Sequence, residues 1–318
     1  MRAWVLPLMI TALGCSSAER GALRVDPALA ALVPSDAVLL AGARMDTLRA
    51  TPLYRKWVAG KPQPMLDRLA ERIGLDPRKD FRELLIASDG NQTLAVARGN
   101  FAERAANNLK HTPRLTYKGY TLLGDERAAL VFINSSTAAA GPAPALRALL
   151  DGRNRRRAPS ALLAKAGTLP ASTQVWIVSS NTSTLAGELP SSGNLAMLGK
   201  ILAMLDSFTA AADLRAGLRL SAEGSSPKEA DARTICDAVR GLVGLARLNT
   251  PDDAPELLRA YDGIRVEQAQ RAVRLKAEIA EDLLDALLAR FQKGGLPGPG
   301  LKPRLPGLQP PETRAGGK

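Results

Sequence analysis

The same order of predicted elements occurs twice in this chain, and this repetition is the feature that most limits the folds open to it. Val33-Pro34-Ser35-Asp36 leads into a short apolar run at 38–43, and Leu169-Pro170-Ala171-Ser172 leads into another at 174–179. Short apolar runs bounded by turn residues are typical of buried strands. Both copies end with two predicted strands and a helix. We therefore expect two structurally related halves.

Hairpins and helices alternate in the first half. Asp89-Gly90 separates two apolar runs, which is a strong signal for a β-hairpin, and a second hairpin is expected to turn near Gly124-Asp125. Leu66, Leu69, Ala70 and Ile73 follow the spacing of one apolar helix face. Further helices are expected within residues 46–57, 101–109 and 144–150.

The second half shows a similar alternation with one difference. Apolar and polar residues alternate from Leu214 to Leu220, which predicts a half-buried strand with Arg215 and Arg219 on its exposed face. A long helix is expected after Pro227, followed by a hairpin from 264 to 279 and a helix from 284 to 291. No counterpart is predicted for the return strand that follows Asp89-Gly90 in the first half.

This alternation favours the α+β class, with two related halves of mainly antiparallel sheet and helices packed on one face. Whether the halves form separate domains or share one sheet is left open by the pattern. The last segment is rich in Pro and Gly and is expected to be disordered. The expected segments are a signal peptide at 1–14, a tether at 15–31, the first half at 32–152, a basic linker at 153–168, the second half at 169–292 and the tail at 293–318.

The first fifteen residues are typical of a bacterial lipoprotein signal. Arg2 precedes an apolar run that ends in small residues before Cys15, as in an export signal, and the run is too short to span a bilayer. Lipid on Cys15 would anchor the chain to a bacterial membrane. We expect the periplasmic face of the outer membrane rather than the inner membrane, because Ser16 and not an aspartate follows the cysteine. The alternative is cleavage near Ala18, which would release a secreted or periplasmic protein.

The net charge of +12 favours an anionic partner. For an exported chain we expect anionic lipid, an acidic polymer or an envelope protein, and not nucleic acid. Arginine suits phosphate because it forms bidentate hydrogen bonds. The alternative is a solvated linker and a charge that is spread over the surface. The candidate anion-binding residues are Arg153, Arg155, Arg156, Arg157, Arg215 and Arg219.

The sequence offers no familiar catalytic set, and no catalytic residue, metal or cofactor is predicted. His111 is the only histidine, and Cys236 is the only cysteine besides Cys15, whereas nucleophilic triads and zinc sites need clusters of such residues. The composition favours a non-catalytic binding or scaffold module. The alternative is a hydrolase-like or carrier protein that uses arginines and carboxylates in a cleft between the halves. The candidate carboxylates are Glu223, Glu267 and Glu278.

Residues 33–53 also carry a resemblance to a group of bacterial proteins. Val33-Pro34-Ser35-Asp36-Ala37, the apolar run after it, Asp46-Thr47-Leu48 and Thr51-Pro52-Leu53 resemble the start of bacterial envelope proteins with an L-P-x-D-A motif and repeated α+β units. The resemblance extends over residues 32–292. It implies an envelope location and a repeated α+β fold, and it implies no activity or catalytic residue.

Overall fold

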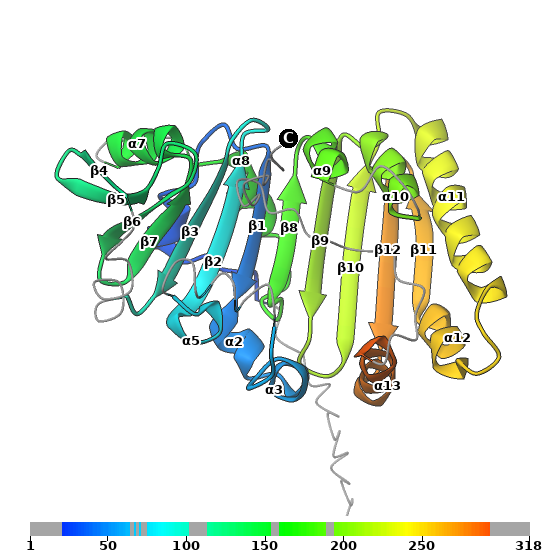
Figure 1. Ribbon diagram of the computed structural model, residues 1–318. Coiled ribbons are helices and arrows are strands. Elements are labelled where there is room, and N and C mark those ends of the chain that lie inside the picture. Colours follow the sequence, from blue (N-terminus) through cyan, green and yellow to red (C-terminus); the bar gives the residue numbers. More distant parts are fainter. Residues whose placement is uncertain are drawn as a thin grey trace, which may run out of the picture.

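A single antiparallel sheet of twelve strands organises the computed structural model, which describes residues 21–63, 67, 70, 75–101, 113–153, 159–188 and 194–292 (Figure 1). The strand order is β11-β12-β10-β9-β8-β1-β2-β3-β7-β6-β5-β4. The α+β class with mainly antiparallel sheet is therefore confirmed. The strands are β1 (Leu39–Arg44), β2 (Phe81–Ser88), β3 (Thr93–Gly99), β4 (Arg114–Tyr117), β5 (Tyr120–Gly124), β6 (Ala129–Asn134), β7 (Thr137–Gly141), β8 (Val175–Ser179), β9 (Ser207–Asp213), β10 (Leu218–Ser225), β11 (Ile264–Ala269) and β12 (Ala272–Ile279).

Short helices join the strands of the first half, and longer helices follow in the second half. Three of the short helices, α1, α3 and α5, begin with proline directly after a capping residue, Asp26, Thr51 or Asp76, whose side chain accepts a backbone N–H of the first turn. The helices are α1 (Pro27–Ala30), α2 (Met45–Arg49), α3 (Pro52–Trp57), α5 (Pro77–Asp80), α7 (Ala143–Gly152), α8 (Ala161–Ala166), α9 (Thr182–Glu188), α10 (Asn194–Ala203), α11 (Glu229–Leu248), α12 (Pro255–Asp262) and α13 (Glu281–Gln292).

The two halves share the sheet through the pair β1–β8 at its centre. Leu39 lies opposite Ser179, and Ala43 lies opposite Val175. Outward from this pair the order is β1-β2-β3-β7-β6 on one side and β8-β9-β10-β12-β11 on the other. An approximate twofold axis near the Ala41–Ile177 pair therefore relates the halves. The sequence pattern left open whether the halves form separate domains or share one sheet. The structure has one shared sheet.

The prediction for residues 214–220 is wrong. These residues span the turn between β9 and β10 and only the start of β10. Gly217 has a φ of 86°, a conformation that suits glycine and allows the chain to reverse there. The second half therefore has its own hairpin, β9–β10, as the counterpart of β2–β3. The predicted absence of a return strand is also wrong.

Several other elements match the predictions. The hairpin at Asp89-Gly90 forms between β2 and β3, and the hairpin near Gly124-Asp125 forms between β5 and β6. The helix expected within 46–57 is two helices, α2 and α3, because Thr51-Pro52 starts a new one. The helix expected at 101–109 and most of the one at 66–73 lie outside the described residues.

Two segment boundaries differ from the expected ones. Residues within the expected tether are packed into the fold, since Leu23 and Leu29 are buried and Ala22 forms a bridge with Pro170. Residues within the expected linker form α8, whose Leu162 is buried. Apolar side chains thus place both segments in the core. The expected signal peptide, Cys15 and the tail lie outside the described residues.

The two faces of the sheet are covered by different helices. One face, called here the α7 face, packs against α1, α7 and α8 in the first half, where Leu40, Leu85 and Val131 are fully buried. The opposite face packs against α10 and α11 in the second half, through Ile201 and Ile235. None of the described helices has the length and apolar content needed to cross a membrane.

Candidate functional site

The α7 face is apolar in the first half and charged in the second. Cross-strand pairing aligns one row of residues from each half, because the strands occupy equivalent places about the twofold axis. The row Leu85, Val96, Ala139 and Val131 is buried under helices. The equivalent row is Thr209, Glu223, Arg274 and Glu267. Glu223, Arg274 and Glu267 are exposed, so none of the described helices covers this part of the face.

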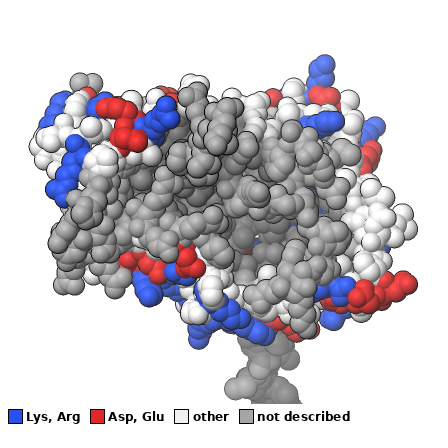
Figure 2. All heavy atoms as spheres, in the orientation of Figure 1, with Lys and Arg blue, Asp and Glu red and all other residues white. Residues whose placement is uncertain are grey.

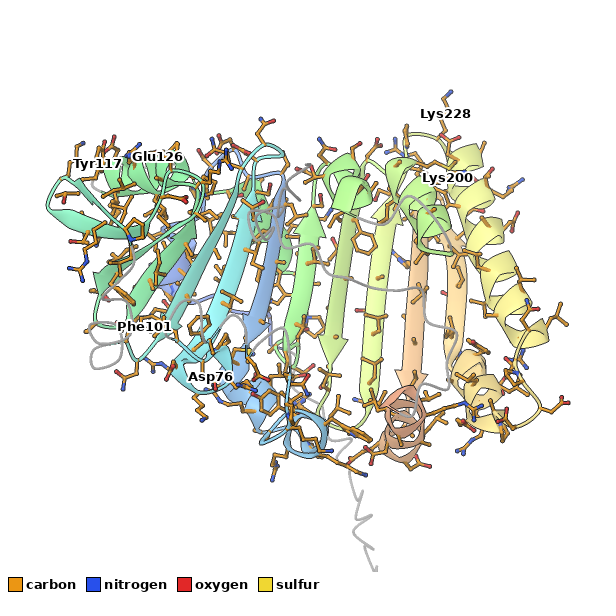
Figure 3. The ribbon with its side chains drawn as sticks, viewed as in Figure 1. Asp76, Phe101, Tyr117, Glu126, Lys200 and Lys228 are labelled. Atoms are coloured by element: carbon orange, nitrogen blue, oxygen red, sulfur yellow. The ribbon has the colours of Figure 1, made fainter. Side chains whose placement is uncertain are left out.

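The different paths of α7 and α13 explain this asymmetry. In the first half the chain leaves the sheet at Pro142, and α7 turns back over the sheet. Tyr117 and Glu126 lie beside α7 in Figure 3; the Tyr117 hydroxyl donates to Asp151 at 3.0 Å, and Arg147 donates to Glu126. In the second half β12 continues to Ile279, and α13 packs instead against α12.

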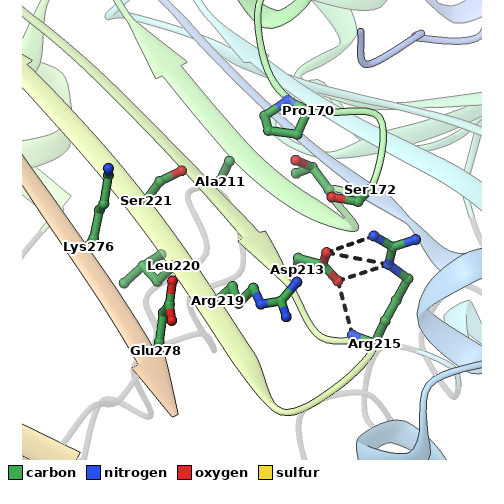
Figure 4. A pocket seen from close by; sticks show the side chains of 11 residues that line it. Pro170, Ser172, Ala211, Asp213, Arg215, Arg219, Leu220, Ser221, Lys276 and Glu278 are labelled. Carbon is green, nitrogen blue, oxygen red and sulfur yellow. Dashed lines mark hydrogen bonds and ion pairs between the residues drawn. The ribbon is translucent and has the colours of Figure 1, made fainter. Parts of the chain in front are cut away.

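A pocket of about 460 Å³ lies on the open part of the α7 face (Figure 4). The turn before β8 forms one wall through Pro170, Ser172 and Thr173, and the strands β9, β10 and β12 form the floor. Its charged lining residues are Asp213, Arg215, Arg219, Lys276 and Glu278.

Arg215 and Asp213 form an ion pair with each other at one side of the pocket. The Arg215 Nη2 lies 3.0 Å from the Asp213 Oδ2, and the Arg215 backbone N–H also donates to this carboxylate. Burial opposes ionisation of Asp213, but hydrogen bonds from Arg215 and Ser172 outweigh it and lower the pKa of Asp213. Asp213 is therefore ionised at neutral pH and already satisfied by its neighbours.

Arg219 and Lys276 are differently placed. Arg219 on β10 lies directly opposite Asp213 on β9 and opposite Glu278 on β12, while Lys276 lies opposite Ser221. Figure 4 shows the side chains of Arg219 and Lys276 standing on the floor of the pocket. Neither cation forms an ion pair with any residue in the described part of the chain. Both can therefore hold an anionic ligand.

The first half contains an equivalent but smaller pocket, with a volume of about 240 Å³. Here α7 contributes Ala145, Ala148 and Leu149, and the residues lining this pocket include no lysine or arginine. Pairing and sequence order match Pro34, Asp36, Ala87, Asp89, Gln92 and Leu94 with Pro170, Ser172, Ala211, Asp213, Arg219 and Ser221. The fold thus provides this site twice, and only the second copy is lined by lysine and arginine.

The structure brings together only part of the predicted anion-binding set. Arg215 and Arg219 line the same pocket, although Arg215 lies in the turn and not on a strand. Arg153 follows α7 in the first half, where it donates to the Tyr120 hydroxyl at 2.5 Å and stacks on that ring. Arg155, Arg156 and Arg157 lie outside the described residues. Lys276 was missed, because its place beside Arg219 depends on the pairing of β10 with β12.

The candidate carboxylates of the alternative hypothesis lie on the same open face. Glu223 accepts from Arg274 at 2.8 Å, and Glu267 lies opposite Arg274 on β11. Glu278 lines the pocket, which forms within the second half and not between the halves. Cys236 is part of α11 and is buried on the side of that helix that packs against the sheet, and His111 lies outside the described residues. Those residues contain no group of three or more side chains suited to holding a metal.

The described charges are mixed in sign over much of the surface. In the view of Figure 2, acidic and basic side chains lie next to one another along the upper and lower margins of the molecule. Many of them form ion pairs, such as Lys118–Asp151 and Arg147–Glu126. Positive charge alone therefore does not locate a site. Arg219 and Lys276 are informative because they line one pocket and form no ion pair with any described residue.

Comparison with known proteins finds distant structural neighbours. No family model matches the chain, and no curated protein matches it. The chain is similar to solved structures of TP0453. Crystal form I has a TM-score of 0.45 and 12% sequence identity, and the match covers 84% of this chain and 97% of that chain. Crystal form III has a TM-score of 0.47 and 11% sequence identity, and the match covers 84% of this chain and 98% of that chain.

Proposed function

We propose that this chain is a bacterial envelope lipoprotein that acts as a non-catalytic binding module, and that it binds an anionic group in the pocket around Arg219 and Lys276. The expected partner is a phosphate-bearing lipid or an acidic polymer of the envelope. The main support is that Arg219 and Lys276 line one pocket and form no ion pair with any described residue, on a sheet face that the equivalent helix covers in the other half.

Physical chemistry supports an anion at this place. Arginine offers a planar set of donors that matches phosphate or carboxylate, and Lys276 adds a second charge beside it. Ser221, which lies opposite Lys276 and two residues along β10 from Arg219, adds a hydroxyl donor to the pocket. A charge-assisted hydrogen bond is stronger than a neutral one, so Arg219 should contribute most of the affinity.

A ligand titration tests the binding part of the proposal. The full chain is titrated with glycerol 3-phosphate, and binding is followed by phosphorus NMR of the ligand. We expect Arg219→Gln to weaken binding about tenfold. Arg259→Gln is the matched control, because it makes the same charge change on α12, outside the pocket. The Arg259 side chain is 64% exposed, and its Nη2 lies 3.8 Å from the Asp282 Oδ2, a long ion pair. Equal binding by the wild-type chain and Arg219→Gln would reject this site.

The mass of the N-terminal peptide tests the envelope part. The chain is expressed with a C-terminal tag in a Gram-negative host, and the wild type is compared with Cys15→Ala. A lipoprotein gives an acylated peptide that begins at Cys15, and this peptide disappears in the variant. An unmodified N-terminus near Ala18 in the wild type would instead identify a protein without a lipid anchor.

A further inference from the structure

We infer that the ligand of the Arg219 pocket is a phosphate ester that also carries an ammonium group, as phosphoethanolamine does. This inference rests on the proposed function and names its ligand class. It depends on the arrangement of opposite charges in the pocket, where a carboxylate stands next to the two cations.

The cationic part of the pocket suits a phosphate better than a carboxylate. Arg219 alone can satisfy both oxygens of a carboxylate through a bidentate contact. Lys276 and the Ser221 hydroxyl line the same pocket and supply donors beyond these two. With its ester oxygens, a phosphate group has more acceptor oxygens than a carboxylate and can accept from more than one of these side chains.

Glu278 is the residue that favours a second, positive charge on the ligand. It lies directly opposite Arg219 in the β10–β12 pairing, and paired positions in an antiparallel sheet have Cβ atoms about 5 Å apart. Glu278 forms no ion pair with any described residue. Asp213, on the other side of Arg219, is already held by Arg215. Glu278 therefore repels a simple anion but can receive an ammonium group that is attached to it.

The equivalent positions in the first half show that these three charges belong to the open pocket. By pairing and sequence order, Gln92 takes the place of Arg219, Gly141 that of Lys276 and Ala143 that of Glu278. Ala143 begins α7, which forms one wall of that pocket. Arg219, Lys276 and Glu278 thus occupy positions that lie under or in α7 in the first half. No described helix packs on these three residues, so packing against a helix does not explain their charges.

The size and the walls of the pocket fit a small headgroup. A volume of about 460 Å³ is in the lower part of the range of small-molecule sites. Pro170 and Ala211 provide apolar surface for the carbon atoms between phosphate and amine. A free ester and a lipid headgroup share this chemistry, and the experiment below separates these two sources.

The test compares two esters of equal phosphate charge. Glycerophosphoethanolamine carries the ammonium group, and glycerophosphoglycerol does not. We expect the wild-type full chain to prefer the first by about threefold to fivefold, the range that an exposed ion pair can supply. Glu278→Gln should remove this preference by weakening the first ester and strengthening the second. Glu267→Gln is the control, because it removes a carboxylate from the same face outside the pocket and should keep the preference.

The outcomes separate this inference from the proposed function. Equal binding of the two esters by the wild type, or a preference that persists in Glu278→Gln, would overturn the inference and leave the anion site standing. Binding of neither ester would overturn both. Vesicles of phosphatidylethanolamine with phosphatidylcholine then identify the source: sedimentation of the wild type with them, lost in Arg219→Gln, indicates the lipid headgroup, and binding of the soluble ester alone indicates a free ester.

Discussion

At the residue scale, Glu83 has the largest pKa shift among the described residues. Burial raises the pKa of this carboxyl to about 7, opposed by the hydrogen bond from the Asp26 backbone N–H. The Asp26 carboxylate raises this pKa further, Arg44 lowers it and Asp46 raises it. Asp26 also pairs with Arg98, which lies opposite Glu83. Glu83 thus helps to hold the N-terminal segment against the sheet.

The pH dependence of stability should reveal this group. A carboxyl whose pKa is raised on folding binds more protons in the folded state, so its ionisation destabilises the fold as pH rises from about 4.5 to about 7. Glu83→Gln keeps an acceptor for the Asp26 N–H and removes the charge. We expect it to be more stable than wild type at pH 8 by about 1–2 kcal/mol, less than the full shift implies because the side chain is partly solvated. Urea unfolding at pH 5 and pH 8 measures this. Parallel pH profiles for both chains would contradict it.

Gly42 is fixed by the indole of Trp176 across the central strand pair. A Cβ on Gly42 would lie 2.4 Å from two carbons of the Trp176 ring, and both residues are buried at the β1–β8 contact. Gly42→Ala should therefore lower the free energy of unfolding by about 1–3 kcal/mol through overpacking. Gly187→Ala is the control, because nothing lies within 4 Å of its Cβ position in α9. Equal losses in the two variants would contradict this account of Gly42.

At the scale of elements, a clear turn signal in the sequence predicted a hairpin, whereas an alternating pattern that runs on through a turn concealed one. Asp89-Gly90 predicted its turn, because Gly90 adopts a positive φ in a short connection. The β9–β10 hairpin was missed because Leu214-Arg215-Ala216 continues the alternation of β10 through the turn. The sequence also did not separate α7 from α13, since both follow a strand and both are amphipathic. Which face each helix covers depends on contacts between distant segments.

One such contact joins α3 of the first half to α13 of the second. The Asp285 carboxylate accepts from the Lys56 Nζ and from the Trp57 Nε1, each at 2.6 Å. Both hydrogen bonds lower the pKa of Asp285, so the carboxylate stays ionised at neutral pH. This contact therefore holds α13 against α3.

Removing this carboxylate should weaken the contact between α3 and α13. We expect Asp285→Ala to lower the free energy of unfolding by about 1–2 kcal/mol, because the Trp57 N–H and Lys56 lose their partner. Asp282→Ala, on the same helix, removes an exposed carboxylate 3.8 Å from Arg259 and should cost less than about 0.5 kcal/mol. Urea unfolding followed by circular dichroism compares the two. A loss of the same size in both would show that the contact adds little.

At the scale of the whole molecule, the repetition in the sequence predicted two related halves but not how they join. The matching segments before β1 and β8 carry that signal, and the twofold arrangement about Ala41 and Ile177 follows it. Arg215 and Arg219 could be selected from sequence as exposed cations. Their grouping with Lys276 could not, because it requires the register between β10 and β12. The open face follows from the path of α13, which no local pattern specifies.

The central claim is that an anionic ligand binds on this open face of the second half. Lysine reactivity measures it most directly: the full chain is acetylated with and without glycerophosphoethanolamine, and modified lysines are mapped by mass spectrometry. We predict that the ligand protects Lys276 and leaves Lys79, which is 71% exposed on α5, as reactive as before. Binding that leaves Lys276 fully reactive, or that protects lysines in the first half instead, would contradict the claim.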